Sequence, residues 1–562
     1  MSVKSAIVRC AFVLPLAFVF SVCSCSCSQN PQDPAPPPPM PPPGLLQGAT
    51  WQYSMDGGAS FSPLEPTIPA ETTFVILAKT EFNVDDLPDA AAIQLTHTVP
   101  LRHPMVWRLN GQEIKVPLEG MWYRIIPGID PQLLRKGRNI LTVEVTVRNV
   151  TTRTAYAWTI TLGVSASLVP IKAEDLKVQT GPIVGAFGRD FVTVTLRTNL
   201  PARVALDADP VEFKQWTLQR RPEIHLESPE GFHHRFLVKP VKGDSITYAL
   251  TVSTPKATCS VPGTTIRIPR GGGKLRFVVL GDSRSNPKDW GKLSDMVLQL
   301  KPVLVVHTGD LVWYGPEDWR WDEEFAVPAK EMLASVPFLP VYGNHEPNTP
   351  LLKTLFYTPS RDGTASNWAQ KVGSVLLIGI DGVQNWSQDG KNARWLEKTL
   401  AGSKAKFVFL ANHYPAWTSS RHGTLTLANR PKEKTIRQGQ EVVFPLLVKY
   451  GATAMLAGHD HCYERSEPPG GVSHIITGGG GASLYWKSYD AEEQNPHSKV
   501  FTSEFHYCVF DVDGDTCTMK AVTIEGQEID TRTWTARDSK REPVTSSPSS
   551  ATSNPASATG NQ

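Results

Sequence analysis

Cysteine is scarce in this sequence, and its placement excludes small cross-linked folds. The 562 residues contain eight cysteines, of which four lie in the N-terminal leader-like segment. The other four are scattered and lack zinc-finger spacing, so they form neither a disulfide framework nor a zinc finger: Cys259, Cys462, Cys508 and Cys517. Cys508 and Cys517 flank the hairpin-like segment VFDVDGDT, so we expect them to be the pair that oxidises in an exported protein.

An excess of charge of either sign is also absent. The chain has 56 Lys and Arg against 54 Asp and Glu, a net charge of +2, and it contains no long basic run. We therefore expect no nucleic-acid partner. The composition, with 40% hydrophobic and 20% charged residues, is that of a globular protein. At about 150 residues per domain, the length predicts three or four domains.

The apolar run near the N-terminus is too short to span a bilayer comfortably. The run AFVLPLAFVFSV follows two basic residues and has the length of a signal-peptide core. The segment VCSC at Cys25 resembles a bacterial lipobox, and FSVC at Cys23 resembles it less closely. Residues 1–28 are thus predicted to be a leader, either a simple cleaved signal peptide or a lipoprotein leader with a lipid anchor at the membrane. Both predict an exported protein that is periplasmic, secreted or an outer-membrane lipoprotein.

Proline and strand patterns divide the N-terminal half of the chain. Residues 29–44 form a proline-rich linker. Residues 45–166 contain alternating strands such as NILTVEVTVRN and are predicted to form a β-sandwich. The phrase LLRKGRNILTVEV resembles galactose-binding-like jelly rolls, which implies a carbohydrate or cell-wall partner, and a sandwich that only packs is the alternative. Residues 167–270, with FVTVTLRTN and ITYALTVST, suit an immunoglobulin-like or fibronectin-like sandwich.

The pattern changes in the C-terminal half. Over residues 271–536, apolar strands such as LRFVVL and KFVFLAN alternate with helical segments, which is typical of a layered α/β domain. Residues 537–562 are rich in Ser, Thr and Pro, and we expect them to be disordered. The fold class predicted for the whole chain is therefore multidomain, with N-terminal β-sandwich modules followed by an α/β domain.

Polar residues follow five apolar strands of this domain at their carboxyl ends, the edge where open α/β sheets bind ligands. They are Asp282, Asp310, Asn344 with His345, His413, and His459 with His461. Two cations about 3.5–4 Å apart can clamp the attacking and leaving oxygens of a phosphoryl group. Carboxylate, amide and imidazole ligands suit zinc, iron or manganese. The pattern therefore predicts a centre of two divalent or trivalent metal ions.

The segments GDSR, GDLV, GNHE, NHYP and GHDH, in this order, resemble the calcineurin-like metallophosphoesterases. The β module before them makes the chain similar to the purple acid phosphatase branch. The resemblance implies a four-layer α/β/β/α sandwich and hydrolysis of phosphate monoesters by a metal-bound hydroxide. A phosphodiesterase is the nearer alternative. The alternative from another class is an envelope binding protein with a degenerate metal site.

The resemblance also implies a role for each site residue. Six residues match ligand positions: Asp282 and His461 at the first metal, Asn344, His413 and His459 at the second, and Asp310 bridging both. His345 would steady the phosphate or protonate the leaving group. His422 would contact the phosphate, or it would cap its loop.

Two positions depart from the family pattern at the first metal. Many relatives carry a ligand histidine in GDxH, where this chain has Arg284, which cannot coordinate a cation. Purple acid phosphatases lack that histidine too and carry a ligand tyrosine at the position of Trp313, with Tyr314 as the neighbouring candidate in this chain. We expect Arg284 to direct its planar fork of donors at the phosphate. A surface salt bridge to Asp289 is the alternative.

Overall fold

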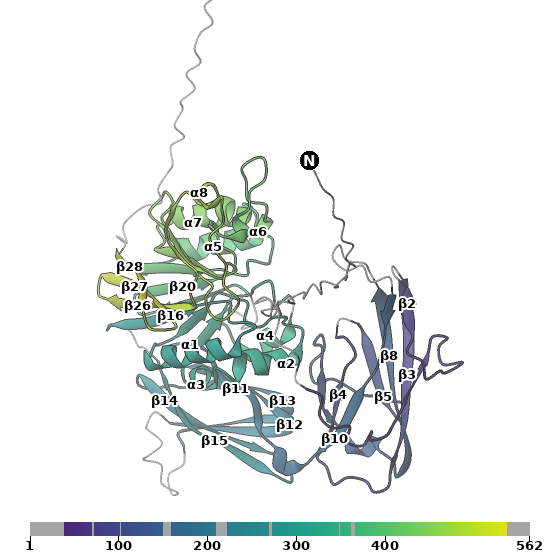
Figure 1. The fold of residues 1–562 in the computed structure, drawn as a ribbon. Coiled ribbons are helices and arrows are strands. Elements are labelled where there is room, and N and C mark those ends of the chain that lie inside the picture. The colour runs from purple at the N-terminus through teal and green to yellow at the C-terminus, as the bar shows by residue number, and fades with distance from the viewer. Residues whose placement is uncertain are drawn as a thin grey trace, which may run out of the picture. The chain divides into compact units, whose positions relative to one another are not determined.

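The computed structural model describes residues 37, 39–69, 72–101, 103–149, 159–209, 222–268, 273–347, 349–360 and 366–536 (Figure 1). All of these belong to one compact unit that begins at Pro34. The predicted leader, residues 1–28, and the predicted tail, residues 537–562, lie outside the described residues. Among the described helices, none has the length and apolar character needed to cross a membrane.

The first β-rich region contains two main antiparallel sheets. One has the order β1 (Trp51–Ser54), β3 (Thr72–Val84), β8 (Gly137–Asn149), β5 (Met105–Leu109) and β6 (Gln112–Glu113). The other has the order β10 (Ala166–Ile171), β4 (Ala92–His97) and β7 (Ile125–Ile129), and β2 (Thr67–Pro69) pairs with β9 (Thr159–Thr161). Alternate residues of β8, among them Val143 and Val145, are fully buried. The period-two pattern therefore places one face of β8 in the core.

The second β-rich region forms one antiparallel sheet around the long strand β12 (Val192–Asp209). Its other strands are β11 (Val178–Phe187), β13 (Ile224–Val238), β14 (Ser245–Ser253) and β15 (Thr258–Arg267). Val194 and Leu196 face the core, as their alternation predicts, but Thr195 and Arg197 on the opposite face are also buried. That face packs against the α/β region, where the Thr195 hydroxyl donates to the Leu355 carbonyl.

The C-terminal α/β region contains two mixed sheets. The first has the order β18 (Phe338–Pro340), β17 (Val305–His307), β16 (Leu275–Leu280), β26 (His506–Asp513), β27 (Thr516–Thr523) and β28 (Glu528–Thr535). The second has the order β19 (Trp368–Val372), β20 (Val375–Gly379), β21 (Phe407–Ala411), β22 (Ala454–Ala457), β24 (Ser473–Thr477), β23 (Tyr463–Ser466) and β25 (Ser498–Thr502). Strands β16 to β18 are parallel to one another, as are β20, β21, β22 and β24.

The described helices are mostly short. The α-helices are α1 (Pro287–Gln299), α2 (Asp318–Arg320), α3 (Lys330–Ser335), α4 (Pro350–Leu355), α5 (Lys391–Ala401), α6 (Lys434–Gln438), α7 (Phe444–Lys449) and α8 (Ala491–Gln494). The 3-10 and π segments are η1 (Pro131–Leu133), η2 (Ala173–Asp175), η4 (Trp321–Ala326), η5 (Arg421–Gly423) and η6 (Gly439–Val443).

The two sheets and their helices form the predicted α/β/β/α sandwich. Between the sheets, Phe277 of β16 lies 5.5 Å from Phe409 of β21, ring centroid to ring centroid. Val278 packs in one outer core with α1 and α3, while Val408 packs in the other with α5 and α7. Strands with apolar residues on both faces are therefore covered on both faces, and the fold class that the sequence predicts is confirmed.

The predicted pairing of Cys508 and Cys517 is wrong. The four cysteines among the described residues are free. Strands β26 and β27 pair so that Cys508 lies opposite Ala521, whereas Cys517 lies opposite Val512. The hairpin register therefore separates the two sulfurs along the strands. Burial raises the pKa of each thiol to about 12.

A buried ionic cluster joins β12 to the α/β region. The guanidinium of Arg197 contacts the carboxylates of Asp318 and Asp322. Gln179 Nε2 also donates to Asp322, at 2.7 Å. Burial raises the pKa of Asp318 to about 6, because the neighbouring Asp322 carboxylate acts in the same direction and Arg197 only partly opposes them. These residues line a hollow of about 820 Å³.

Candidate metal centre

The two sheets bring the predicted strand-end residues to one place. The loops after β16, β17 and β18 carry Asp282, Asp310 and Asn344, and the loops after β21 and β22 carry His413 and His459. His413 Nε2 lies 2.9 Å from Asn344 Oδ1 and 3.3 Å from Asp310 Oδ1. Residues from both sheets thus meet at shared atoms, as the strand-end pattern predicts.

Three of these residues have a left-handed backbone. Their φ angles are +60° at Asp282, +57° at Asp310 and +71° at His459. This conformation is uncommon outside glycine, costs about 1–3 kcal/mol per residue and concentrates at functional sites. Gly343, which precedes Asn344, permits close contact with this centre, because a Cβ atom there would overlap the Asp310 carboxylate. The backbone at Asp282, Asp310 and His459 is therefore locally strained, and this conformation directs the three side chains toward the centre.

Glu346 holds the loop that carries Asp310. Its Oε1 accepts hydrogen bonds from the backbone N–H groups of Leu311 and Val312, at 2.8 and 3.2 Å. Its Oε2 accepts from those of Asp310 and Gly343, at 3.1 and 3.0 Å. The sequence marks Glu346 only as the last letter of GNHE, and its role as a fully buried acceptor for four amides becomes visible in the structure.

Three acceptor atoms, from Asn344, His413 and His459, meet at the second metal position. His459 Nδ1 lies 2.9 Å from Asn344 Oδ1 and 3.2 Å from His413 Nε2. His413 donates from Nδ1 to the Thr308 carbonyl, at 2.9 Å, so its Nε2 carries a lone pair. His459 places its Nε2 at 3.1 Å from the Glu433 carboxylate, so its Nδ1 carries a lone pair as well.

These three acceptor atoms, together with Asp310 Oδ1 as a fourth, fit a metal ion. Among the described residues they meet with no donor hydrogen between them, which is unfavourable unless a cation lies among them. Burial lowers the pKa of His413, and it lowers the pKa of His459 to about 3, so both rings are neutral and able to coordinate. Burial opposes ionisation of Asp310, but its neighbours, among them the Arg284 guanidinium, hold its pKa below the ordinary value.

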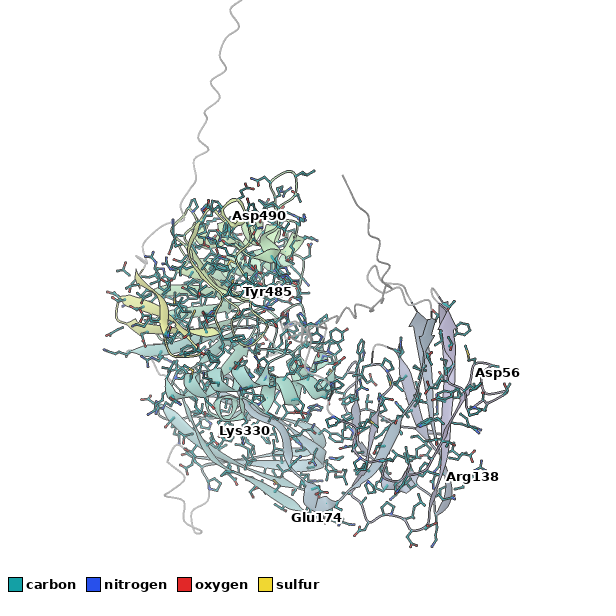
Figure 2. All side chains as sticks on the ribbon, in the orientation of Figure 1. Asp56, Arg138, Glu174, Lys330, Tyr485 and Asp490 are labelled. Carbon is teal, nitrogen blue, oxygen red and sulfur yellow. The ribbon has the colours of Figure 1, made fainter. Side chains whose placement is uncertain are left out.

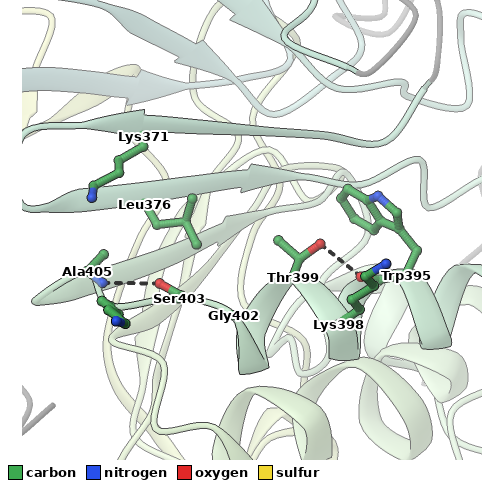
Figure 3. A pocket seen from close by; sticks show the side chains of 9 residues that line it. Lys371, Leu376, Trp395, Lys398, Thr399, Gly402, Ser403 and Ala405 are labelled. Atoms are coloured by element: carbon green, nitrogen blue, oxygen red, sulfur yellow. Dashed lines mark hydrogen bonds between the residues drawn. The ribbon is translucent and has the colours of Figure 1, made fainter.

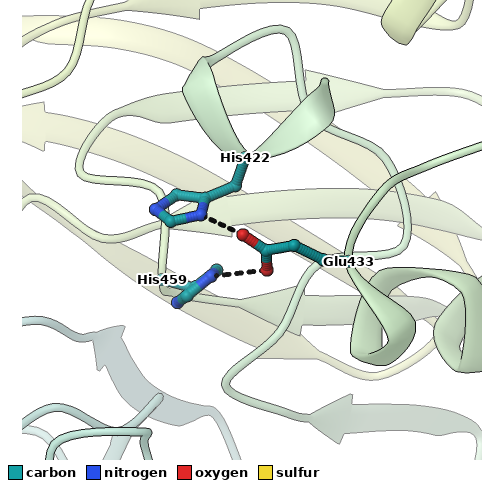
Figure 4. A group of neighbouring side chains, drawn as sticks. All are labelled: His422, Glu433 and His459. Carbon is teal, nitrogen blue, oxygen red and sulfur yellow. Dashed lines mark hydrogen bonds and ion pairs between the residues drawn. The ribbon is translucent and has the colours of Figure 1, made fainter. Parts of the chain in front are cut away.

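Glu433 joins two histidines of the site, as Figure 4 shows. One carboxylate oxygen contacts His422 Nδ1, and the other lies 3.1 Å from His459 Nε2. The two imidazole rings are 4.0 Å apart, centroid to centroid. Burial lowers the pKa of His422, but the bond to Glu433 outweighs it and raises the pKa above the ordinary value. Sequence reasoning missed Glu433, because it lies in a loop and follows no strand.

The first metal position has a different composition. Asp282 Oδ1 lies 3.6 Å from His461 Nε2, and His461 donates from Nδ1 to the Ser483 carbonyl, at 2.6 Å. The guanidinium of Arg284 faces these acceptors, with Nη2 at 3.3 Å from His461 Nε2 and Nε at 3.4 Å from Asp310 Oδ2. The guanidinium of Arg284 therefore lies among the atoms that the resemblance assigns to a first metal, while Asp282, Asp310 and His413 present ligand atoms within 4.8 Å of one another.

Aromatic rings cover this part of the site. The Trp313 ring lies 4.8 Å from the Arg284 guanidinium and 5.1 Å from the His345 ring. Tyr314 lies elsewhere, with its ring 5.2 Å from that of Trp122. Tyr485, labelled in Figure 2, stacks on the His461 ring at 4.0 Å. The ring that faces Arg284 at the family's tyrosine position is therefore that of Trp313.

His345 lies beside Asp310. Its backbone N–H donates to Asp310 Oδ1 at 3.1 Å, and its Nε2 is 3.7 Å from Asp310 Oδ2. Its Nδ1 donates to the Trp313 carbonyl. Burial lowers the pKa of His345. The Asp310 carboxylate raises it, and the Arg284 guanidinium lowers it further. Asp289, the alternative partner for Arg284, instead accepts a hydrogen bond from Asn286 at 2.6 Å.

A separate hollow lies between α5 and the edge of the second sheet (Figure 3). Its volume is about 590 Å³, and its lining includes Lys371, Lys398 and Lys404. No residue of the candidate metal centre lines it in the part of the chain that the structure describes. We therefore place the candidate catalytic site at the strand ends that carry the metal-centre residues, and not in this hollow.

Comparison with known proteins agrees with this geometry. The family model for calcineurin-like phosphoesterases matches residues 275–463. Tartrate-resistant acid phosphatase type 5 from Rattus norvegicus is 38% identical over 267 residues, covering 40% of this chain and 75% of that protein. Probable inactive purple acid phosphatase 9 from Arabidopsis thaliana is 28% identical over 203 residues, covering 29% of this chain and 30% of that protein.

A solved structure shows the same fold over most of the chain. Purple acid phosphatase PPD1 from yellow lupin (Lupinus luteus) matches with a TM-score of 0.56 at 15% identity, covering 87% of this chain and 96% of that one. The rat relative matches in sequence over three quarters of its own length. The chain therefore belongs to the calcineurin-like phosphoesterases, hydrolases that act on phosphoesters, and within them to the branch of the purple acid phosphatases.

Proposed function

We propose that this protein is an exported hydrolase of phosphate monoesters. The observation that carries the proposal is the meeting of acceptor atoms from Asn344, His413 and His459, which lie 2.9–3.2 Å from one another, with Asp310 Oδ1 at 3.3 Å from His413 Nε2. Relatives named acid phosphatases support monoesters as the substrate class. Export rests on the leader pattern of residues 1–28. The resemblance implies a dinuclear centre, and in this chain the Arg284 guanidinium lies next to the ligands assigned to its first metal.

A cation held by these four residues would neutralise phosphoryl oxygens and lower the pKa of a water molecule toward neutrality. The protein's contribution is to fix the four donor atoms, with His459 oriented by Glu433 and the Asp310 loop held by Glu346. Partners of this kind set ligand orientation and tautomer.

His345 supplies the proton for the leaving group in this proposal. Its Nδ1 donates to the Trp313 carbonyl, so only the protonated ring carries a second N–H, at Nε2. That atom lies on the Asp310 side of the ring. Since the pKa of His345 is lowered by burial, protonation and hence leaving-group departure are favoured at acidic pH.

His422 and Arg284 would bind the phosphate. The bond from His422 Nδ1 to Glu433 keeps its ring cationic to higher pH and leaves Nε2 to donate to a phosphate oxygen. Arg284 would add donors from the opposite side, next to His461. Cationic donors of this kind make short, charge-assisted hydrogen bonds to phosphate.

The test is phosphate release from 4-nitrophenyl phosphate and nitrophenol release from its bis-ester, each measured after loading with Mn²⁺ or Zn²⁺. We expect the monoester kcat/KM to exceed that of the diester by about tenfold or more. Asn344→Ala should abolish turnover, while Asn385→Ala, at an exposed position, serves as the matched control. A preference for the diester would favour the phosphodiesterase alternative. Metal binding without any hydrolysis would favour a binding protein.

A further inference from the structure

The guanidinium of Arg284 lies where the ligands of a first metal would converge. Its Nε and Nη2 contact one acceptor each, Asp310 Oδ2 at 3.4 Å and His461 Nε2 at 3.3 Å. Resting on the function proposed above, we propose that the protein holds a single catalytic metal ion, and that Arg284 is the fixed second cation of its centre.

The charges of the site favour this arrangement. Asp282 and Asp310 are buried carboxylates, with 0% and 1% of their surfaces exposed. A guanidinium and one divalent ion together more than balance them. A second metal ion would be placed next to a permanently charged guanidinium with little water to screen the repulsion. Arg284 is itself only 7% exposed.

The two departures from the family pattern complement each other. Arginine at position 284 offers no imidazole to a metal, and tryptophan at position 313 offers no phenolic oxygen. The Trp313 ring lies 4.8 Å from the guanidinium carbon, a cation–π distance. Ser285 Oγ lies 3.5 Å from Nη1 and completes the contacts. Trp313 and Ser285 therefore complete a binding site for the guanidinium, because they add a flat ring face and an acceptor atom to the contacts with Asp310 and His461.

The guanidinium also retains donors for a substrate. Of its five N–H bonds, one each is directed at Asp310, His461 and Ser285. The two that remain lie in the same plane and suit two oxygens of one phosphate. Arg284 would thus bind and neutralise phosphate, which is the part of the first metal's role that does not require coordination of water.

The test counts metal ions without using turnover. The full chain and its variants are loaded with Mn²⁺, freed of excess ion, and measured for manganese per chain and by electron paramagnetic resonance. We expect one Mn²⁺ per chain and the spectrum of an isolated ion for the wild type and for Arg284→Lys, which keeps the charge. We expect two Mn²⁺ and an exchange-coupled spectrum for Arg284→His, which supplies an imidazole ligand and removes the permanent charge.

Two coupled ions in the wild type would overturn the proposal. So would a single ion in a folded Arg284→His variant, with folding checked by thermal unfolding. If that variant fails to fold, Arg284→Ala takes its place with the same expected count. Phosphate release from the same samples separates the two proposals. One ion without hydrolysis supports a centre with one metal and Arg284, and it contradicts the proposed function. Two ions with hydrolysis overturn the centre with one metal and support the proposed function.

Discussion

The Nε2 atom of His459 lies 3.1 Å from a carboxylate oxygen of Glu433 (Figure 4). The carboxylate thereby fixes the ring tautomer that leaves Nδ1 as a lone-pair donor facing Asn344. The same carboxylate contacts His422, so one side chain orients a candidate ligand and a candidate phosphate contact together.

Removing Glu433 should therefore weaken metal binding before it affects folding. We expect Glu433→Ala to lower metal affinity by about 10–100-fold, with turnover partly restored at saturating metal. Competition with a chelator measures the affinity. Glu441→Ala, at an exposed glutamate that pairs with Arg430, is the control. Equal affinities in the two variants would show that Glu433 does not orient His459.

Glu346→Gln should destabilise the fold as well as the site. The wild-type carboxylate accepts four backbone N–H bonds, whereas the glutamine amide would direct two of its own hydrogens at N–H donors. Leaving buried donors unpaired should lower the free energy of unfolding by about 2–4 kcal/mol. Urea denaturation measures it, with the exposed Glu331→Gln as control. An unchanged midpoint would contradict the role given to Glu346.

His345→Ala should affect substrates according to their leaving groups. An alkyl phosphate needs a proton on its departing oxygen, so we expect kcat to fall by about 10²–10⁴-fold. 4-Nitrophenyl phosphate has a good leaving group and should lose far less. Because burial lowers the pKa of His345, wild-type activity on the alkyl substrate should decline as pH rises through that lowered value. Equal losses on both substrates would exclude His345 as the acid.

The cluster of Arg197, Asp318 and Asp322 predicts an unusual pH dependence of stability. The pKa of Asp318 in the folded protein, about 6, lies above its ordinary value of 3.8, so the protonated form is favoured by folding. The stability that protonation contributes is present below about pH 4 and is lost as pH rises through 6.

Asp318→Asn keeps the acceptor for Arg197 and removes the excess charge. We expect the variant to match the wild type near pH 4 and to exceed it by about 1–3 kcal/mol above pH 6. Denaturation curves across this range measure the difference, and the exposed Asp295→Asn should show no such trend. A variant less stable than the wild type above pH 6 would contradict this account.

The sequence predicts the parts of this centre that depend on local pattern. Strand ends place Asp282, Asp310 and His413, because parallel strands present their carboxyl ends at one edge. The partners of Arg284 and the role of Glu433 depend on loops that meet only in the folded chain. The burial of Thr195 likewise depends on which region packs against β12.

Register is the other feature that the local pattern leaves open. Cys508 and Cys517 flank one turn, yet the pairing of β26 with β27 places Val512 opposite Cys517. Spacing alone does not determine the register of a hairpin, which also depends on its turn and on the cores on both faces.

The most direct test of the account is to titrate metal-stripped protein with Mn²⁺ while measuring phosphate release from 4-nitrophenyl phosphate. If one metal ion serves the centre, activity rises in proportion to added metal and reaches its maximum at one equivalent per chain, and Asn344→Ala shows neither binding nor activity. Activity that appears only with the second equivalent, or that survives in Asn344→Ala, would contradict it.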